Sequence, residues 1–273
     1  MSTSLTGIDG DEMVHKSMEE SGGELRLLQV SPAVLSRYVK VLSEDDGEVD
    51  TVRALVGEDA LKEVMDDFLV ASAASDLIEQ GKLELLSTSD DSRRSLVLVG
   101  GSEVMSFVDV GGAIGAVSTD DEEIVNRGSD MFESMWENGD DFRIRTPPAS
   151  RVRETLREEI GEETQEDFEE ILDLLETAKG DGDGLDEITV ALLAAARNEV
   201  LLYDISKWGE DSGVASKATF SRKKTELEDS GLIDTENVPI DIGRPRLRLK
   251  FSDESLHDAP LGDIVEAAKN ATE

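Results

Sequence analysis

The sequence has no cysteine and only two histidines among its 273 residues. Without cysteine there can be no disulfide, no thiolate zinc site and no cysteine nucleophile. His15 and His257 both lie in polar segments, where a solvated surface residue is a better interpretation than a catalytic base. We therefore expect no catalytic residue, no metal site and no cofactor, and we predict that the protein is not an enzyme.

Long apolar runs are also missing. No uninterrupted apolar stretch approaches the roughly 20 residues that a membrane span requires. The first 21 residues are polar and acidic, without the basic flank and apolar centre of a signal peptide. The sequence thus predicts a soluble, cytoplasmic protein with no membrane partner.

Basic and aromatic residues are scarce. The chain has 27 Lys and Arg against 63 Asp and Glu, a net charge of -36, and only 4% aromatic residues. Its apolar residues nevertheless fall in periodic runs, which a disordered acidic chain would lack. An acidic interaction tail would form one block, and a calcium-binding loop would be longer than the aspartate and glycine run at 181–184. We interpret the acidity as a halophile's adaptation to a salty cytoplasm.

The first half of the chain alternates short apolar runs with amphipathic stretches. These patterns predict helices over residues 33–42, 58–80 and 120–137, and strands over residues 25–30, 49–57, 83–86, 94–99, 103–109, 113–117 and 142–145. Strands that first alternate with helices and then follow at hairpin spacing indicate an α/β fold with a mixed sheet. We place an α/β sensor or dimerisation domain at residues 1–146, ending at Pro147 and Pro148.

Two further helical patterns, over residues 151–160 and 164–178, precede a run of glycine and aspartate at 180–184. They predict either a dimerisation or connector arm, or helices that pack on their own domain. We assign residues 147–184 as a helical connector and hinge.

From residue 185 onward the pattern changes. Helices are predicted over residues 186–198, 201–209 and 215–229, and strands over 232–235 and 247–251 on either side of a turn at 243–246. Three helices followed by a β-hairpin with a basic tip indicate a winged helix-turn-helix, whose third helix enters the major groove of DNA. In that helix we expect Ala218, Phe220 and Leu227 to face the core. This domain is placed at residues 185–255, with an acidic tail at 256–273.

The charge distribution supports a DNA-binding interpretation. Residues 185–251 hold 10 basic and 12 acidic side chains, a net of -2, so the rest of the chain carries -34. Phosphate contact requires Lys, Arg and hydroxyl groups. We expect double-stranded promoter DNA as the partner, contacted by Ser216, Lys217, Thr219, Arg222 and Lys223 of the third helix and by Arg244, Arg246 and Arg248 of the wing.

Two other classes of function remain open. The basic residues could merely balance local acids, in which case the chain would be an adaptor that modulates another regulator through protein contacts. An enzyme with a phosphate-binding loop is the other class. The glycine pairs at 100–101 and 111–112 match neither G-x-G-x-x-G nor the Walker pattern, and no helix directly follows them. They are better interpreted as turn glycines.

The stretch LLYDISKWGEDSGVASKATFSRKKTELEDSGLI at 201–233, with GRPR at 243–246, resembles haloarchaeal transcription regulators of the TbsP type. The resemblance spans nearly the whole chain. It implies a homodimer that regulates genes of central carbon metabolism, with a metabolite effector or a second regulator as a further partner.

Residues 95–142 resemble half of a phospholipase-D-like fold, which the TrmB family of sugar-responsive archaeal regulators uses for effector sensing. In TrmB the DNA-binding domain comes first, so the order of domains differs here. Catalytic phospholipase-D domains need an H-x-K pair. Neither histidine of this chain is followed by that pattern, which excludes that activity.

Overall fold

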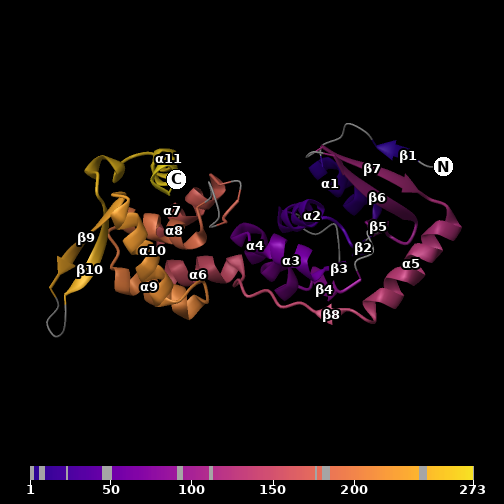
Figure 1. Cartoon of the computed structure of the whole chain (residues 1–273), viewed down its shortest axis with the longest axis horizontal. Coiled ribbons are helices and arrows are strands. Elements are labelled where there is room, and N and C mark those ends of the chain that lie inside the picture. Colours follow the sequence, from indigo (N-terminus) through magenta and orange to yellow (C-terminus); the bar gives the residue numbers. More distant parts are fainter. Residues whose placement is uncertain are drawn as a thin grey trace. The chain divides into compact units, whose positions relative to one another are not determined.

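The computed structural model describes residues 3–5, 10–22, 24–44, 51–90, 95–110, 113–175, 177–179, 185–239 and 245–272. The chain divides into two compact units (Figure 1). The first unit comprises residues 1–66 and 70–145, and the second comprises residues 67–69 and 146–273. Part of the predicted turn at 243–246, the turn at 111–112 and the predicted hinge lie outside the described residues.

The first unit contains eight strands and most of five helices among the described residues. In chain order the elements are β1 (Thr3–Leu5), α1 (Gly10–Glu20), β2 (Glu24–Leu28), α2 (Pro32–Glu44), β3 (Thr51–Gly57), α3 (Glu58–Met65), α4 (Phe68–Glu79), β4 (Leu83–Thr88), β5 (Leu96–Val99), β6 (Glu103–Val110), β7 (Ala113–Thr119), α5 (Glu122–Trp136) and β8 (Asp140–Asp141). None of the described helices of either unit is long and apolar enough to cross a membrane.

The strands form one sheet in the order β1-β7-β6-β5-β2-β3-β4-β8. The pairs β2 with β3 and β3 with β4 are parallel, and their crossovers contain α2 and the α3–α4 segment. The remaining pairs are antiparallel, including the β5-β6-β7 meander. This confirms the mixed-sheet α/β fold expected for the first half of the chain.

Each face of the sheet has its own hydrophobic core, because side chains alternate along every strand. Leu25 and Leu27 of β2 point to the side covered by α1 to α4, whereas Leu28 points to the side of α5. Figure 1 shows α5 on one side of the strands and α1 to α3 on the other. On the α5 side, Phe132 is completely buried and stacks on Trp136 with ring centroids 5.4 Å apart.

Two arginines on neighbouring strands hold α5 to this face. Arg26 and Arg53 lie opposite each other in the parallel β2–β3 pair. Arg53 Nη2 donates to Glu133 of α5 at 2.7 Å and to Glu24 at 2.9 Å, and its guanidinium lies over the ring of Phe132. The hydrogen bond from Arg26, together with both positive charges, lowers the pKa of Glu24 although partial burial opposes this. The network is charge-balanced and fastens helix to sheet.

The predicted single helix over 58–80 is two helices, which is a correction. The helix is interrupted at Asp66 and Asp67, which separate α3 from α4. Asp67 is buried, and its carboxylate accepts hydrogen bonds from the backbone N–H groups of Leu69 and Ala178, both at 3.1 Å. Aspartate favours the start of a helix because it can accept such bonds. The apolar spacing continues through the break and therefore did not reveal it.

The two ends of the first unit also differ from the sequence prediction. The polar and acidic first 21 residues contain a helix that their composition does not predict, α1, whose Met13, Val14 and Met18 are buried while His15 is exposed. The predicted edge strand at 142–145 is wrong. The edge strand is the two-residue β8 immediately before it, paired with β4.

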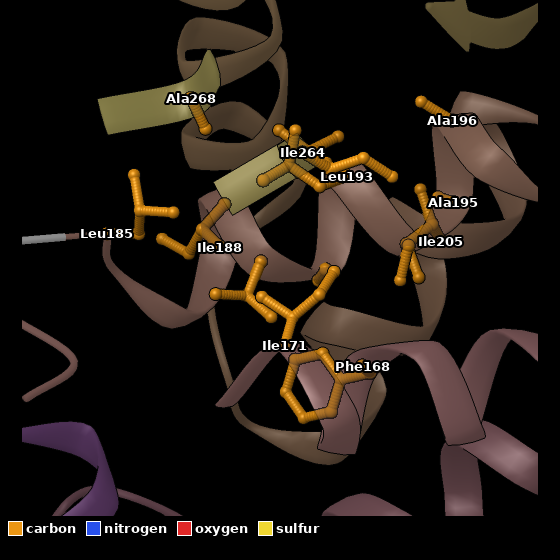
Figure 2. Packing of buried hydrophobic residues seen from close by; sticks show 14 of the residues in the cluster. Phe168, Ile171, Leu185, Ile188, Leu193, Ala195, Ala196, Ile205, Ile264 and Ala268 are labelled. Atoms are coloured by element: carbon orange, nitrogen blue, oxygen red, sulfur yellow. The ribbon is translucent and has the colours of Figure 1, made fainter. Parts of the chain in front are cut away.

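The second unit consists of α6 (Ala149–Glu159), α7 (Glu162–Asp173), α8 (Glu187–Arg197), α9 (Leu202–Ser212), α10 (Lys217–Asp229), β9 (Ile233–Val238), β10 (Arg246–Phe251), a 3₁₀ turn at Glu254–Leu256 and α11 (Leu261–Thr272). Its core surrounds α8, in which every residue from Ile188 to Ala196 is buried. Figure 2 shows side chains of α7, α9 and α11 around this helix. The buried faces of α6 and α7 belong to the same core, through Val152 and Phe168 among others.

The segment predicted as an acidic tail contains α11, which is a second correction. Leu261, Ile264, Val265 and Ala268 are buried in the core of the second unit. Their spacing of three, four and seven residues is that of one helix face. The acidic residues between them dominate the composition but occupy the other face. The remaining histidine, His257, is exposed just before this helix.

Replacing Asp67 with alanine should lower the free energy of unfolding by about 2 kcal/mol, because two backbone N–H groups lose their acceptor. Urea denaturation of the full chain measures this. The neighbouring Asp66 is exposed, so Asp66→Ala is the matched control and should stay within about 0.5 kcal/mol of the parent chain. Equal losses for the two variants would contradict the role given to Asp67.

Candidate nucleic-acid interface

The helices α9 and α10 form a helix-turn-helix whose turn is set by a glycine and a cap. Gly213 ends α9 with φ of 87°, in the left-handed region that favours glycine. The N–H of Ala215 then bonds back to the carbonyl of Gly209 at 3.0 Å. Ser216 starts α10, and its hydroxyl accepts the N–H of Thr219 at 3.2 Å. The helix predicted over 201–209 therefore ends too early, because α9 continues to Ser212.

A close contact fixes how α9 and α10 cross. A methyl group added to Gly209 of α9 would lie 2.1 Å from Cε2 of Phe220 in α10. Phe220 is fully buried, so its ring has no free space to move into. Glycine lets the two helices approach at this point.

The wing is a hairpin formed by β9 and β10, and it packs on the helices by one side. Ile233, Leu249 and Phe251 are buried. The N–H of Leu249 donates to the carbonyl of Val200, and Leu201 forms a single antiparallel β-bridge with Arg248. The α8–α9 connection is thus joined to β10. Arg246, Arg248 and Lys250 alternate with these buried residues along β10. The predicted contact residue Arg244 falls in the sequence between β9 and β10 and lies outside the described residues.

The outward face of α10 differs in part from the sequence prediction. Phe220 and Leu227 are buried as expected, whereas Ala218, expected in the core, is exposed. The exposed residues at the spacing of one helix face are Ala218, Ser221, Arg222, Thr225 and Asp229. Arg222 is largely exposed: 72% of its side chain is accessible to solvent, and its Nε lies 3.8 Å from Glu226. From Ala218 to Thr225 the face therefore presents small groups, two hydroxyls and one arginine, and Asp229 follows at the end of the helix.

Ser216 and Thr219 lie at the amino-terminal end of α10. Their hydroxyl oxygens are 2.9 Å apart. Ser216 is exposed and Thr219 is partly exposed. Because Ser216 caps the helix, its hydroxyl has a structural role in addition to any contact with a ligand.

Lys217 is paired with a carboxylate of α9. Its Nζ donates to Glu210 at 2.6 Å, and both side chains are nearly half exposed. This hydrogen bond raises the pKa of Lys217 and lowers the pKa of Glu210. Lys217 therefore reaches solvent as a member of an ion pair.

Lys223 and Lys224 point back toward the body of the unit. Lys223 Nζ lies 2.9 Å from Asp186, the residue that caps α8. Burial opposes the charge of Lys223, but the hydrogen bonds to Asp186 and Glu226 outweigh it and raise the pKa. Lys224 bonds to Glu228 at 2.6 Å with only 12% of its side chain exposed. Lys223 thus ties α10 to the start of α8, and the ion pair of Lys224 lies within α10.

The wing arginines contact residues at the start of α9 and just before it. The Arg246 guanidinium lies 4.0 Å from the centroid of the Tyr203 ring, and its Nη1 donates to Asp204 at 3.2 Å. Arg248 Nη1 donates to Glu199 at 3.4 Å. Tyr203 is 47% exposed, which is unusual for an aromatic side chain of this unit. The wing and α9 thus share one polar surface.

Sequence reasoning missed three residues of this surface: Ser221, Thr225 and Tyr203. The spacing of Ser221, Arg222 and Thr225 could have indicated a common face once Phe220 and Leu227 were assigned to the core. Nothing in the spacing indicated that Tyr203 lies under Arg246, because that contact joins segments 43 residues apart in the sequence.

Three helices, a turn closed by Gly213 and a hairpin packed on them define the second unit as a winged helix-turn-helix. Two family models match the chain, "Transcriptional regulator TbsP-like, N-terminal" over residues 2–147 and "Transcriptional regulator TbsP-like, C-terminal HTH domain" over residues 148–269. The chain belongs to the TbsP-like transcriptional regulators. No curated protein matches it.

Solved structures resemble about half of the chain. TrmBL2, described as an archaeal chromatin protein with a novel mode of DNA binding, is 20% identical over 52% of this chain and 54% of its own, with a TM-score of 0.37. The phospholipase D family member Nuc from Salmonella typhimurium is 12% identical over 52% of this chain and 98% of its own, with a TM-score of 0.38. NucT from Helicobacter pylori is 9% identical over 52% and 99%, with a TM-score of 0.35. Scores this low carry no functional argument.

Substituting alanine at Gly209 should destabilise the helix-turn-helix by about 1 to 3 kcal/mol, because the new methyl group overlaps the buried ring of Phe220. Thermal unfolding followed by circular dichroism measures the effect. Gly262 in α11 has nothing within 4 Å of its added methyl position. Gly262→Ala is therefore the control and should cause no loss, since alanine favours a helix. A stable Gly209→Ala protein would show that the helices can move apart.

Proposed function

We propose that the protein binds double-stranded promoter DNA by inserting α10 into the major groove. The exposed face of α10 formed by Ala218, Ser221, Arg222 and Thr225 is the observation that carries this proposal. Small and hydroxyl side chains let a helix approach base edges closely, and an arginine can donate two hydrogen bonds to guanine O6 and N7. Arg222 is the candidate for base recognition, because no hydrogen bond holds it in another direction among the described contacts.

The remaining predicted contact residues would position the protein on the DNA backbone. Ser216, Lys217 and Thr219 surround the start of α10, where the helix N-terminus favours a phosphate. Arg246 and Arg248 lie on β10 of the wing, and Arg244 precedes them in the sequence. Lys223 contributes mainly by fixing α10, since its ammonium group faces Asp186. Contacts of this kind fix orientation and register without reading sequence.

We further propose that the protein acts as a homodimer on genes of central carbon metabolism, with the first unit serving to sense an effector or to dimerise. The family membership supports a regulator but specifies neither the genes nor the effector. A dimer with two recognition helices should select a palindromic site with half-sites about one or two DNA turns apart. A selected site without such symmetry would contradict the dimer.

The decisive experiment is selection of binding sites by the purified full chain from a library of random DNA duplexes. The parent chain should enrich a defined sequence. For a duplex of that sequence, Arg222→Ala should weaken binding by about 10- to 100-fold, the value of one bidentate base contact, and relax the preference at one position. Fluorescence anisotropy at fixed salt measures both affinities.

The control is Arg127→Ala in α5, which removes an equally exposed arginine from an ion pair in the first unit. It should leave the affinity unchanged. If the parent chain enriches no sequence, or if Arg222→Ala and the parent bind the same duplex equally, the DNA-reading proposal fails. The adaptor function would then become the better hypothesis.

A further inference from the structure

Three basic side chains of the proposed interface are already neutralised within the chain. The pairs, with their nitrogen to oxygen distances, are Lys217–Glu210 at 2.6 Å, Arg246–Asp204 at 3.2 Å and Arg248–Glu199 at 3.4 Å. All three carboxylates come from α9 or from the turn just before it. Each of them is therefore on the surface that the proposed function directs toward DNA.

These pairs contribute little to folding. Their side chains are 36% to 53% exposed, and exposed ion pairs are screened by water and salt. The pairs Lys223–Asp186 and Lys224–Glu228 are different, with exposures of only 12% to 26%. Lys223–Asp186 ties α10 to the start of α8, whereas Lys224–Glu228 lies within α10 itself. Folding stability therefore does not explain why the three exposed ion pairs are present.

Glu199 provides an independent indication. Its φ is 50°, in the left-handed region that glycine and asparagine favour. The turn between α8 and α9 keeps a carboxylate where backbone geometry alone would favour glycine. The ion pair with Arg248 explains why a glutamate occupies this position.

Arg222 differs from the three paired residues. Its nearest carboxylate oxygen among the described residues is 3.8 Å away, beyond hydrogen-bond distance, and the side chain is 72% exposed. Arg222, which is proposed to recognise bases, has no hydrogen-bonded carboxylate among the described residues. The side chains proposed to contact phosphates are each paired with a carboxylate. This division separates sequence reading from backbone affinity.

We infer that Glu199, Asp204 and Glu210 are built-in counter-ions that lower the affinity for the DNA backbone and flatten its dependence on salt. The inference rests on the proposed function and names the regulation of the same site. A phosphate that approaches Lys217 also meets Glu210, so the pair brings no net positive charge to the DNA. The same holds for Arg246 with Asp204 and for Arg248 with Glu199.

The expected magnitudes follow from electrostatics. A basic side chain that neutralises one phosphate contributes about -0.9 to the slope of log affinity against log salt concentration. A side chain that carries its own carboxylate contributes close to zero. Removing one carboxylate should therefore steepen the slope by about 0.9. It should also raise the affinity by about three-fold at low salt, since two unit charges about 6 Å apart still interact measurably in water.

The experiment replaces each carboxylate with its amide, singly and together, as Glu199→Gln, Asp204→Asn and Glu210→Gln in the full chain. Fluorescence anisotropy with a labelled 30-base-pair duplex of the selected sequence, and with a random duplex of the same length, is measured from about 0.1 to about 1 M KCl. The triple variant should bind both duplexes about ten-fold or more tightly at the lowest salt, with a visibly steeper slope. Its preference for the selected duplex should not increase, because phosphate contacts carry no sequence information.

Glu123→Gln in α5 is the matched control, because Glu123 also forms an exposed ion pair, with Arg127 at 2.7 Å. It changes the net charge by the same amount and should leave slope and affinity unchanged. The inference is overturned if the amide variants at 199, 204 and 210 behave like this control while the parent binds DNA and Arg222→Ala binds it less well. It is also overturned, together with the proposed function, if neither the parent nor the triple variant binds any duplex. Binding by the triple variant alone would support it.

Discussion

The second unit depends on the burial of α8, whose circumference is apolar on every side. Nine consecutive residues of this helix are buried, a pattern that only a central helix can satisfy. The alanines at 194–196 keep the helix thin, so that α7, α9, α10 and β10 can all pack against it. The position of α10 follows, because Phe220 and Leu227 must reach this core and the opposite face must then point outward. The proposed DNA-reading surface is thus a consequence of how α8 is packed.

Much of the fold could be predicted from the sequence, because strands and amphipathic helices have distinct apolar periods. The failures have specific causes. The α3–α4 break was hidden because the apolar spacing runs through it, while the determining bond joins Asp67 to Ala178, 111 residues away. The helix α11 is missed when the acidic composition of residues 256–273 is given more weight than the helical spacing of their apolar residues. In both places a property of the whole segment, its apolar spacing or its acidic composition, did not reveal the few buried contacts that determine its structure.

The site was harder to predict than the fold, since it depends on the rotation of one helix. Phe220 and Leu227 are seven residues apart, and the two apolar positions do not fill the buried face of α10. The stems of Lys223 and Lys224 complete it, with their ammonium groups held by Asp186 and Glu228. Long charged side chains can cover apolar surface in this way. An expectation that every lysine is exposed therefore misplaces the outward face by part of a turn.

The ion pairs around α9 also bear on how a chain with a net charge of -36 could approach DNA at all. At about 0.01 M salt the Debye length is roughly 30 Å, so the acidic surface as a whole would repel DNA. At about 1 M it is roughly 3 Å, and charges outside the interface no longer act on the phosphates. The pairs at 199, 204 and 210 have separations of 2.6 to 3.4 Å, comparable with that length. Under such conditions only charges in direct contact with a phosphate act on it, so the total charge no longer determines how strongly the backbone is held. Sequence preference would then rest on the contacts of α10, which screening affects least because they are direct hydrogen bonds to base edges.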